Sequence, residues 1–312
     1  MIVDITKVYF QSGRGGEGSS SLMRISSRKA FACGGDGGRG GDVILKVSPH
    51  LYDLSKFKGN KKFIAKNGQQ GKEKNKYGKN AEDLIVKVPR GTRVIENQKV
   101  LVDLADREKS FLICRGGRGG KGNNKRSYCL PPQEGEAKEI VLDYRIPNEV
   151  AILGFANSGK TSIFNSLTGQ KAKVAGYPFT TTSCFWSEIE HEFKKFTVLD
   201  TPSIKEAKPG LKYTENAFLR HIFRSRLIIL ISDNCLGFKN DFLRLKNEIS
   251  LFDSGLLKEK IFFYLLAKVD KIDKENIQKK NSLQNPQEAY AVSVKEFQGI
   301  DKLKKLIFDN LG

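Results

Sequence analysis

The sequence predicts two domains, the second an α/β domain with a mostly parallel sheet covered by helices on both faces. From Glu149 onward, short apolar runs alternate with stretches of helical periodicity, which is typical of such a sheet. Before that point glycine dominates, since 21 of the 30 glycines lie within residues 1–148. We therefore expect a glycine-rich domain over residues 1–148 and the α/β domain over residues 149–312.

The charge of the chain favours a polyanionic partner. The formal net charge is +19, and residues 1–148 carry 29 Lys and Arg against 16 Asp and Glu, a charge of +13. Residues 149–312 hold 25 Lys and Arg against 19 Asp and Glu and contribute a charge of +6. Such a surplus attracts nucleic acid or anionic membrane, although lysine enrichment that only improves solubility stays open as an alternative. Because no apolar run reaches the roughly 18 residues that span a bilayer, nucleic acid is favoured and no membrane span is expected.

The first half places glycine clusters between strand-like stretches. The main clusters are GRGGEG at 13–18, GGDGGRGG at 34–41 and GGRGGKG at 116–122. They lack a strict collagen triplet, and a flexible linker is the alternative interpretation. Strand-like residues 42–47 and 83–88 flank the clusters, so we expect extended segments that approach one another closely, without Cβ atoms, in a rigid bundle.

A phosphate-binding loop is predicted at the start of the second domain. Residues 154–161, GFANSGKT, match G-x-x-x-x-G-K-[ST], between a strand-like run and a helical one. Lys160 would bring positive charge to the β and γ phosphates, and the hydroxyl of Thr161 would bind Mg²⁺. The expected contacts are Gly154, Phe155, Ala156, Asn157, Ser158, Gly159, Lys160, Thr161 and Ser162.

Two further segments are expected near the γ phosphate and the metal. Asp200 ends an apolar strand about forty residues after the loop, followed by Thr201 and Pro202, and its carboxylate can reach magnesium through water. Between them, YPFTTT at 177–182 offers hydroxyls that could order around the phosphate, or is only a strand edge. The contacts expected from this segment are Phe179, Thr180 and Thr181, with Thr181 as a second metal ligand and, beside Lys160, a catalytic residue.

A base pocket is expected after the strand that ends in LLAKVD at 265–270. The stem of Lys268 can lie over a base, while the carboxylate of Asp270 accepts hydrogen bonds from guanine, which favours guanine over adenine. Its neighbours Ala267 and Val269 would line the same pocket. Ser293, Val294 and Lys295, after another apolar run, would close it.

These segments together resemble the Obg family of GTPases over essentially the whole chain. The similar segments are MIVDITKVYFQSGRGGEG, CGGDGGRGGDVIL, LIVKVPRGT, CRGGRGGKGNN, YPFTTT and FLRHIFR. The resemblance implies a domain of left-handed polyproline-type helices packed on a small β-barrel, followed by a P-loop G domain that binds GTP or GDP with Mg²⁺. It also implies a role in large ribosomal subunit assembly through rRNA. Lys72, Lys74, Lys76 and Lys79 would contact rRNA, or form only a solvated face.

Some positions depart from the family pattern. Ser203 stands where the motif DxPG has glycine and Ala267 where NKxD has asparagine, while Ile204 holds the place of the catalytic Gln of Ras-like proteins. Slow hydrolysis is therefore expected, with stimulation by the ribosomal particle. A different class stays open: a non-hydrolysing rRNA-binding scaffold that keeps the loop for structure or passive nucleotide binding. The family's variable C-terminal extension is not expected after Gly312.

The setting expected for the protein is a reducing one. The five cysteines stand far apart without a CxxC pair, which predicts neither a zinc site nor a disulfide framework. Residues 1–10 alternate like a strand and lack the apolar core of a signal peptide. We expect a monomer in a bacterial cytoplasm, with a mitochondrial or other organellar matrix as the alternative.

Overall fold

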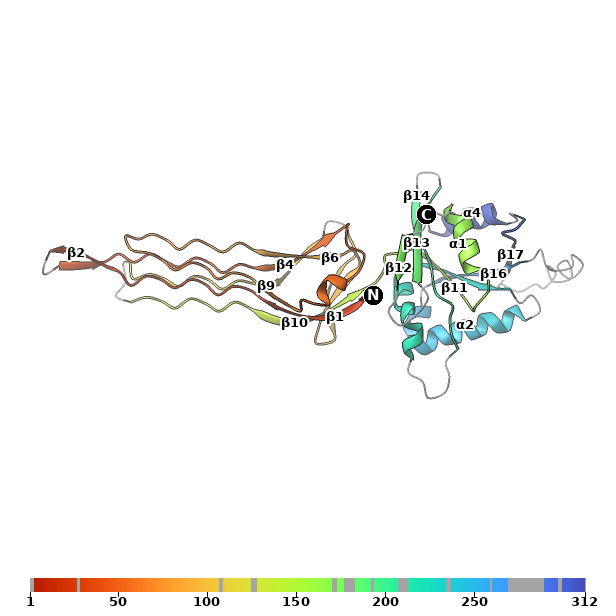
Figure 1. The fold of residues 1–312 in the computed structure, drawn as a ribbon, viewed down its shortest axis with the longest axis horizontal. Helices are drawn as coiled ribbons and strands as arrows, with labels where there is room; N and C mark the ends of the chain where they lie inside the picture. The colour runs from red at the N-terminus through yellow and green to blue at the C-terminus, as the bar shows by residue number, and fades with distance from the viewer. Residues whose placement is uncertain are drawn as a thin grey trace, which may run out of the picture. The chain divides into compact units, whose positions relative to one another are not determined.

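The computed structural model divides the chain into two compact units, a first unit Val3–Tyr144 and a second unit Arg145–Gly312 (Figure 1). The structure describes residues 3–26, 29–106, 109–124, 128–169, 173–176, 183–191, 194–206, 213–233, 237–258, 260–268, 289–296 and 299–311. Residues 145–148 bond within the second unit, where the amide of Ile146 donates to His221 Nδ1 at 3.1 Å. The Asn148 side chain donates to the carbonyl of His221 at 2.9 Å.

Two small sheets form one end of the first unit. One has the strand order β5-β1-β10-β7-β8 and the other β6-β4-β9. Alternate side chains point into a core between them, with Phe10, Leu45 and Ile140 fully buried. The bounds of the elements are β1 (Ile5–Gln11), β4 (Val43–Ser48), η1 (Ser55–Phe57), β5 (Lys62–Ile64), β6 (Leu84–Pro89), β7 (Thr92–Glu96), β8 (Lys99–Leu104), β9 (Ser110–Cys114) and β10 (Ala137–Tyr144).

Extended glycine-rich segments run from these sheets to the hairpin of β2 (Leu22–Ser26) and β3 (Lys29–Ala32), as Figure 1 shows. Backbone bonds join three of them in a ring: Gly16 N donates to Gly38 O at 2.8 Å, Gly37 N to Gly120 O at 2.9 Å and Gly120 N to Gly16 O at 2.8 Å. A Cβ on Gly37 would lie 1.9 Å from the carbonyl oxygen of Gly16. Glycine at every third position suits the three residues per turn of a polyproline helix. The segments are thus a packed bundle and not a flexible linker.

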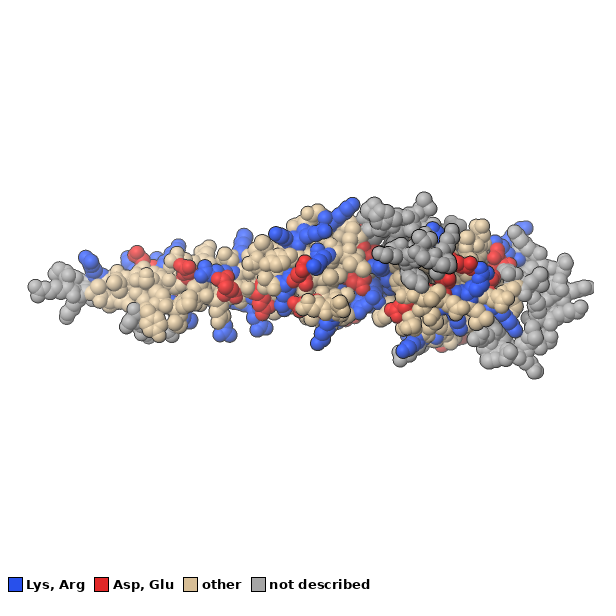
Figure 2. Space-filling view, turned by 90° about the horizontal axis from the view of Figure 1, so that it is seen from below, with Lys and Arg blue, Asp and Glu red and all other residues tan. Residues whose placement is uncertain are grey.

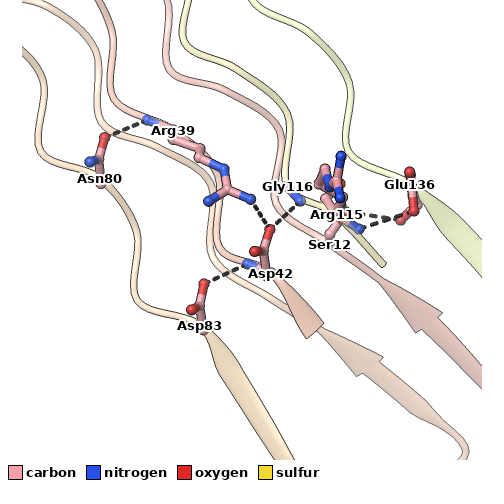
Figure 3. Close-up of polar contacts among 8 residues, drawn as sticks. All are labelled: Ser12, Arg39, Asp42, Asn80, Asp83, Arg115, Gly116 and Glu136. Carbon is pink, nitrogen blue, oxygen red and sulfur yellow. Dashed lines mark hydrogen bonds and ion pairs between the residues drawn. The ribbon is translucent and has the colours of Figure 1, made fainter. Parts of the chain in front are cut away.

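A polar network holds the segments where they enter the sheets (Figure 3). Asp42 is buried, and its Oδ1 accepts hydrogen bonds from the amide of Gly116 at 2.6 Å and from the guanidinium of Arg39. The amide of Asp42 in turn donates to Asp83 Oδ1 at 2.9 Å. The buried carboxylate of Asp42 therefore ties together segments that precede β4 and follow β9, and the exposed carboxylate of Asp83 joins the start of β4 to the start of β6.

The second unit is a seven-stranded sheet of order β12-β13-β14-β11-β15-β16-β17. β14, β11, β15, β16 and β17 are parallel neighbours, and β13 and β12 add an antiparallel edge. All residues of β11 and β15 are buried, as expected for strands covered on both faces. The strand bounds are β11 (Val150–Gly154), β12 (Lys173–Gly176), β13 (Ser183–His191), β14 (Lys194–Asp200), β15 (Leu227–Ser232), β16 (Ile261–Ala267) and β17 (Ala289–Val292).

Helices cover both faces of this sheet. Figure 1 shows α1 (Lys160–Thr168) and α4 (Ile300–Leu311) on one face and α2 (Phe238–Phe252) on the other, where the 3-10 helix η2 (Tyr213–Arg224) also packs. A short 3-10 helix, η3 (Ser254–Leu257), follows α2. The apolar side of α1, with Ile163, Phe164 and Leu167, packs into the core with the strands. No helix within the described ranges is long and apolar enough to cross a membrane.

Candidate nucleotide-binding site

The predicted phosphate loop lies between a buried strand and a helix. β11 ends at Gly154 and α1 begins at Lys160, so the amino end of the helix points toward the loop. Gly159 caps the helix with φ at 93°, a backbone conformation that favours glycine, and Asn157 also has positive φ, at 62°. The amino terminus of a helix carries unbonded amides and partial positive charge, which suits an anion.

Lys160 is buried at the centre of the loop. Its side chain is 7% exposed, and Nζ donates to the carbonyl oxygens of Gly154 at 3.1 Å and Phe155 at 2.7 Å. It also donates to the hydroxyl of Ser203 at 3.1 Å, which is the residue that replaces the glycine of the family motif. Burial lowers the pKa of Lys160 to about 8, although the carboxylates of Asp200 and Asp233 oppose the shift. Lys160 therefore stays mostly protonated at neutral pH.

Asp200 lies at the carboxyl end of β14, and its two carboxylate oxygens differ in their hydrogen bonding. Its Oδ2 accepts a hydrogen bond from Thr161 Oγ1 at 2.8 Å. Its Oδ1 is buried and accepts no hydrogen bond from any residue that the structure describes. Burial raises the pKa of Asp200 to about 6, against the Thr161 hydrogen bond and the charge of Lys160. A buried carboxylate oxygen without a donor, beside a threonine hydroxyl, fits a hard cation that prefers oxygen ligands.

We predict that nucleotide binding at this site requires Mg²⁺ and that this requirement depends on pH through Asp200. Because the pKa of this carboxyl is raised to about 6, a proton competes with the metal below that pH, whereas above it the carboxylate is available. The Mg²⁺ concentration for half-maximal nucleotide binding should rise about tenfold per pH unit below pH 6 and stay flat above it. Titrating Mg²⁺ against a fluorescent GDP analogue measures this, with Asp200→Asn as the control that should lose the pH dependence. A flat profile in the unaltered protein would contradict the assignment.

The base side of the predicted site lies at the same edge of the sheet. β16 and β17 pair in parallel with Ala267 opposite Val292, so Lys268 and Ser293 follow at neighbouring strand ends. Lys268 Nζ donates to the carbonyl of Asn157 in the loop and forms an ion pair with Asp233 Oδ2 at 2.8 Å.

Ala267 and Ser293 on the base side, and Thr201 directly after β14, are all buried. Ala267 is buried and lies beside Gly159, where the family motif has asparagine. Ser293 is fully buried, and its hydroxyl accepts from the amide of Glu296 at 3.3 Å. Thr201 Oγ1 donates to the carbonyl of Ile152 at 2.8 Å, so this side chain holds two strands together.

The structure gathers most of the sequence-predicted residues at the carboxyl edge of the parallel sheet. The residues found there are the loop 154–162, the segment 200–203, Ala267, Lys268 and the segment 293–295. Phe179, Thr180, Thr181, Val269 and Asp270 lie outside the described residues. The sequence interpretation left out Asp233, which pairs with Lys268. Its position directly after β15, at the same edge, is the signal that could have indicated it.

This geometry defines the class of the second unit: a P-loop nucleotide-binding domain. A strand–loop–helix unit carries a buried lysine and a threonine, and the threonine bonds to the aspartate that ends the neighbouring strand β14, as that class requires. The family model described as GTP1/OBG matches residues 3–142, and the one described as 50S ribosome-binding GTPase matches residues 149–268.

Curated relatives extend over almost the whole chain. A GTPase Obg of Thermodesulfovibrio yellowstonii is 32% identical over 329 aligned positions, covering 99% of this chain and 97% of that protein. One of Aquifex aeolicus is 33% identical, with 97% and 94% covered, and one of a Thermoanaerobacter species is 34% identical, with 97% and 76% covered. The chain belongs to the Obg family of GTPases. The expected family, the expected fold class and the assignment as a GTP-binding GTPase are confirmed, and the non-hydrolysing scaffold is not favoured.

Proposed function

We propose that this GTPase acts in the assembly of the large ribosomal subunit and docks on rRNA through its glycine-rich domain, residues 1–148. The observation that carries the proposal is the charge of +13 on those residues, from 29 Lys and Arg against 16 Asp and Glu. A surplus of this kind binds the phosphate backbone and releases counterions. The match of residues 149–268 to a family described as 50S ribosome-binding GTPase supports the same partner.

The surface of the first unit supports docking. Figure 2 shows Lys and Arg side chains spaced along its visible face, with carboxylates between them. Lys72, Lys74, Lys76 and Lys79 are all exposed. The first three lie on a turn that joins two bundle segments, where Lys72 N donates to Lys76 O at 2.8 Å. A rigid bundle presents these cations at low entropic cost, because the backbone that carries them is already ordered.

In the G domain, residues 149–312, the proposed site binds GTP or GDP with Mg²⁺. Lys160 would neutralise phosphate charge, and Thr161 and Thr181 would ligate the metal with Asp200 beside them through water. The metal would supply charge neutralisation at the β and γ phosphates. Asp270, with Lys268 over the base, would select guanine.

Slow intrinsic hydrolysis is part of the proposal. Ile204, at the position of the catalytic Gln of Ras-like proteins, is 3% exposed, and its amide donates to the carbonyl of Gly154 at 3.1 Å. An apolar side chain cannot orient the attacking water, so we infer that the ribosomal particle supplies the group that orients it. We propose a monomer that works in a bacterial cytoplasm, with an organellar matrix as the second candidate.

Hydrolysis measured with and without large-subunit precursor particles tests the proposal. We expect a slow basal rate that rises at least about tenfold on adding the particle, within the range known for GTPase activation in trans. Small-subunit particles and the Lys160→Ala variant serve as controls and should show no rise. Equal rates with both kinds of particle, or failure to co-sediment with the large-subunit precursor, would refute the proposed partner.

A further inference from the structure

A hollow of about 890 Å³ lies on the glycine bundle of the first unit. Its size falls within the roughly 300–1,000 Å³ that small-molecule sites occupy. Gly37, Gly78 and Gly119, from three neighbouring segments of the bundle, are among the residues that line it. Gly78 N donates to Asp36 O at 2.8 Å, and a Cβ on Gly119 would lie 1.9 Å from Gly37 O. These close backbone contacts fix the positions of the segments that line the hollow.

The walls of the hollow carry an excess of positive charge. Asp36, the one carboxylate among the described residues that line it, already forms an ion pair with Lys121 at 2.7 Å and accepts a hydrogen bond from the amide of Gly122 at 2.9 Å. Lys79 and Arg118 are exposed, and neither has an ion-pair partner among the residues that the structure describes. Two cations therefore remain available to a ligand, and an anionic group is the ligand that they would bind.

Two exposed apolar side chains line the same hollow as these cations. Tyr77 and Leu130 line the hollow with 73% and 40% of their surface exposed. An exposed aromatic ring beside unpaired cations is the arrangement with which proteins bind single-stranded nucleic acid, because a base stacks on the ring while its phosphate meets the cation. A paired base within a duplex has its faces covered by its neighbours and cannot stack in this way.

We propose that this hollow binds unpaired nucleotides of single-stranded RNA, with a base on Tyr77 and the phosphates on Arg118 and Lys79. The inference rests on the proposed docking to rRNA and specifies its chemistry. The bundle would recognise the exposed faces of unpaired bases in addition to the charge of the phosphates. An acidic peptide would satisfy the two cations but would leave the ring of Tyr77 without a stacking partner.

Fluorescence anisotropy of the full chain with a labelled single-stranded oligouridylate, at one fixed low salt concentration, tests the proposal. Tyr77→Ala should weaken binding about tenfold, in the range measured for loss of one stacked base, while Tyr77→Phe keeps the ring and should stay within about twofold. Tyr52→Ala removes another exposed tyrosine of the same unit, outside the hollow, and should change nothing. Because Tyr77 is 73% exposed, its removal should leave the fold intact, which thermal unfolding verifies.

The cation is tested through the salt dependence of the same binding. Arg118→Ala should lower the slope of log affinity against log salt by about 0.7, the contribution of one phosphate contact on a single strand, and Arg118→Lys should keep it. The proposal is overturned if Tyr77→Ala binds like Tyr52→Ala, if an RNA duplex competes as well as the single strand, or if polyglutamate does so.

Co-sedimentation separates this inference from the proposed function. If the protein co-sediments with large-subunit precursor but Tyr77→Ala binds the oligouridylate as well as the unaltered protein, only the assignment of the hollow is wrong. If the unaltered protein does not co-sediment with the precursor but Tyr77→Ala still weakens oligouridylate binding, only the proposed ribosomal partner is wrong.

Discussion

We expect the replacement of Lys160 by alanine to abolish detectable GTP binding. The ammonium group is buried in the loop, where it can face the β and γ phosphates, and the loop amides alone cannot balance their charge. Removing one partner of a buried ion pair costs about 3–5 kcal/mol, which corresponds to a loss of affinity between about a hundredfold and several thousandfold. The loss should appear at every pH below about 8, the pKa to which burial lowers this lysine.

Titration with a fluorescent GTP analogue measures the loss. Lys195→Ala is the matched control, because Lys195 is an exposed lysine of the same sheet. Among the residues that the structure describes it forms an ion pair with Glu190 at 3.0 Å alone, and its removal should leave affinity unchanged. Thermal unfolding of Lys160→Ala shows whether the loop still folds without the bonds to Gly154 and Phe155. A folded variant with unchanged affinity would rule out the role assigned to Lys160.

We expect the proposed binding of the full chain to large-subunit rRNA to weaken by at least about a hundredfold when the salt concentration rises from 50 to 200 mM. Each phosphate that the protein neutralises contributes a slope of roughly 0.7 to 0.9 on a log-log plot, so about five contacts suffice for a change of this size. A solubilising surface would show no saturable binding from which such a slope could be obtained. Filter binding over a salt series gives both affinity and slope.

The role of the lysines at and after the turn of residues 72–76 can be tested in the same salt series. Replacing Lys72, Lys74, Lys76 and Lys79 together by alanine should lower the slope, since these exposed side chains are proposed phosphate contacts. GTP affinity should not change, because the phosphate loop belongs to the other unit. A matched control replaces the four exposed lysines at η1 and β5, Lys56, Lys58, Lys61 and Lys62. Equal loss of slope in both variants would mean that charge alone, and not the turn, determines docking.

Local patterns were predictable from the sequence because their physical cause is local. The phosphate loop requires glycine and lysine at fixed spacing within one strand–turn–helix, and α1 begins at Lys160 as this spacing demands. The alternation of buried strands with amphipathic stretches likewise predicted a parallel sheet covered on both faces. Because parallel strands end at one edge, residues as distant as Asp200 and Ser293 could be assigned to one site before their positions were known.

Long-range partners were decided only by the tertiary structure. Glycine clusters indicate close approach but not which segments approach, since every cluster lacks side chains in the same way. The ring of backbone hydrogen bonds among Gly16, Gly37, Gly38 and Gly120 is one of several pairings that the sequence allows equally. The buried, half-bonded state of Asp200 and the ion pair between Lys268 and Asp233 depend on what packs around them. Composition and spacing determined which chemical groups this chain carries. Burial and charge environment, which arise only when distant segments meet, determined the pKa values, the bonding partners and the hollow beside Tyr77.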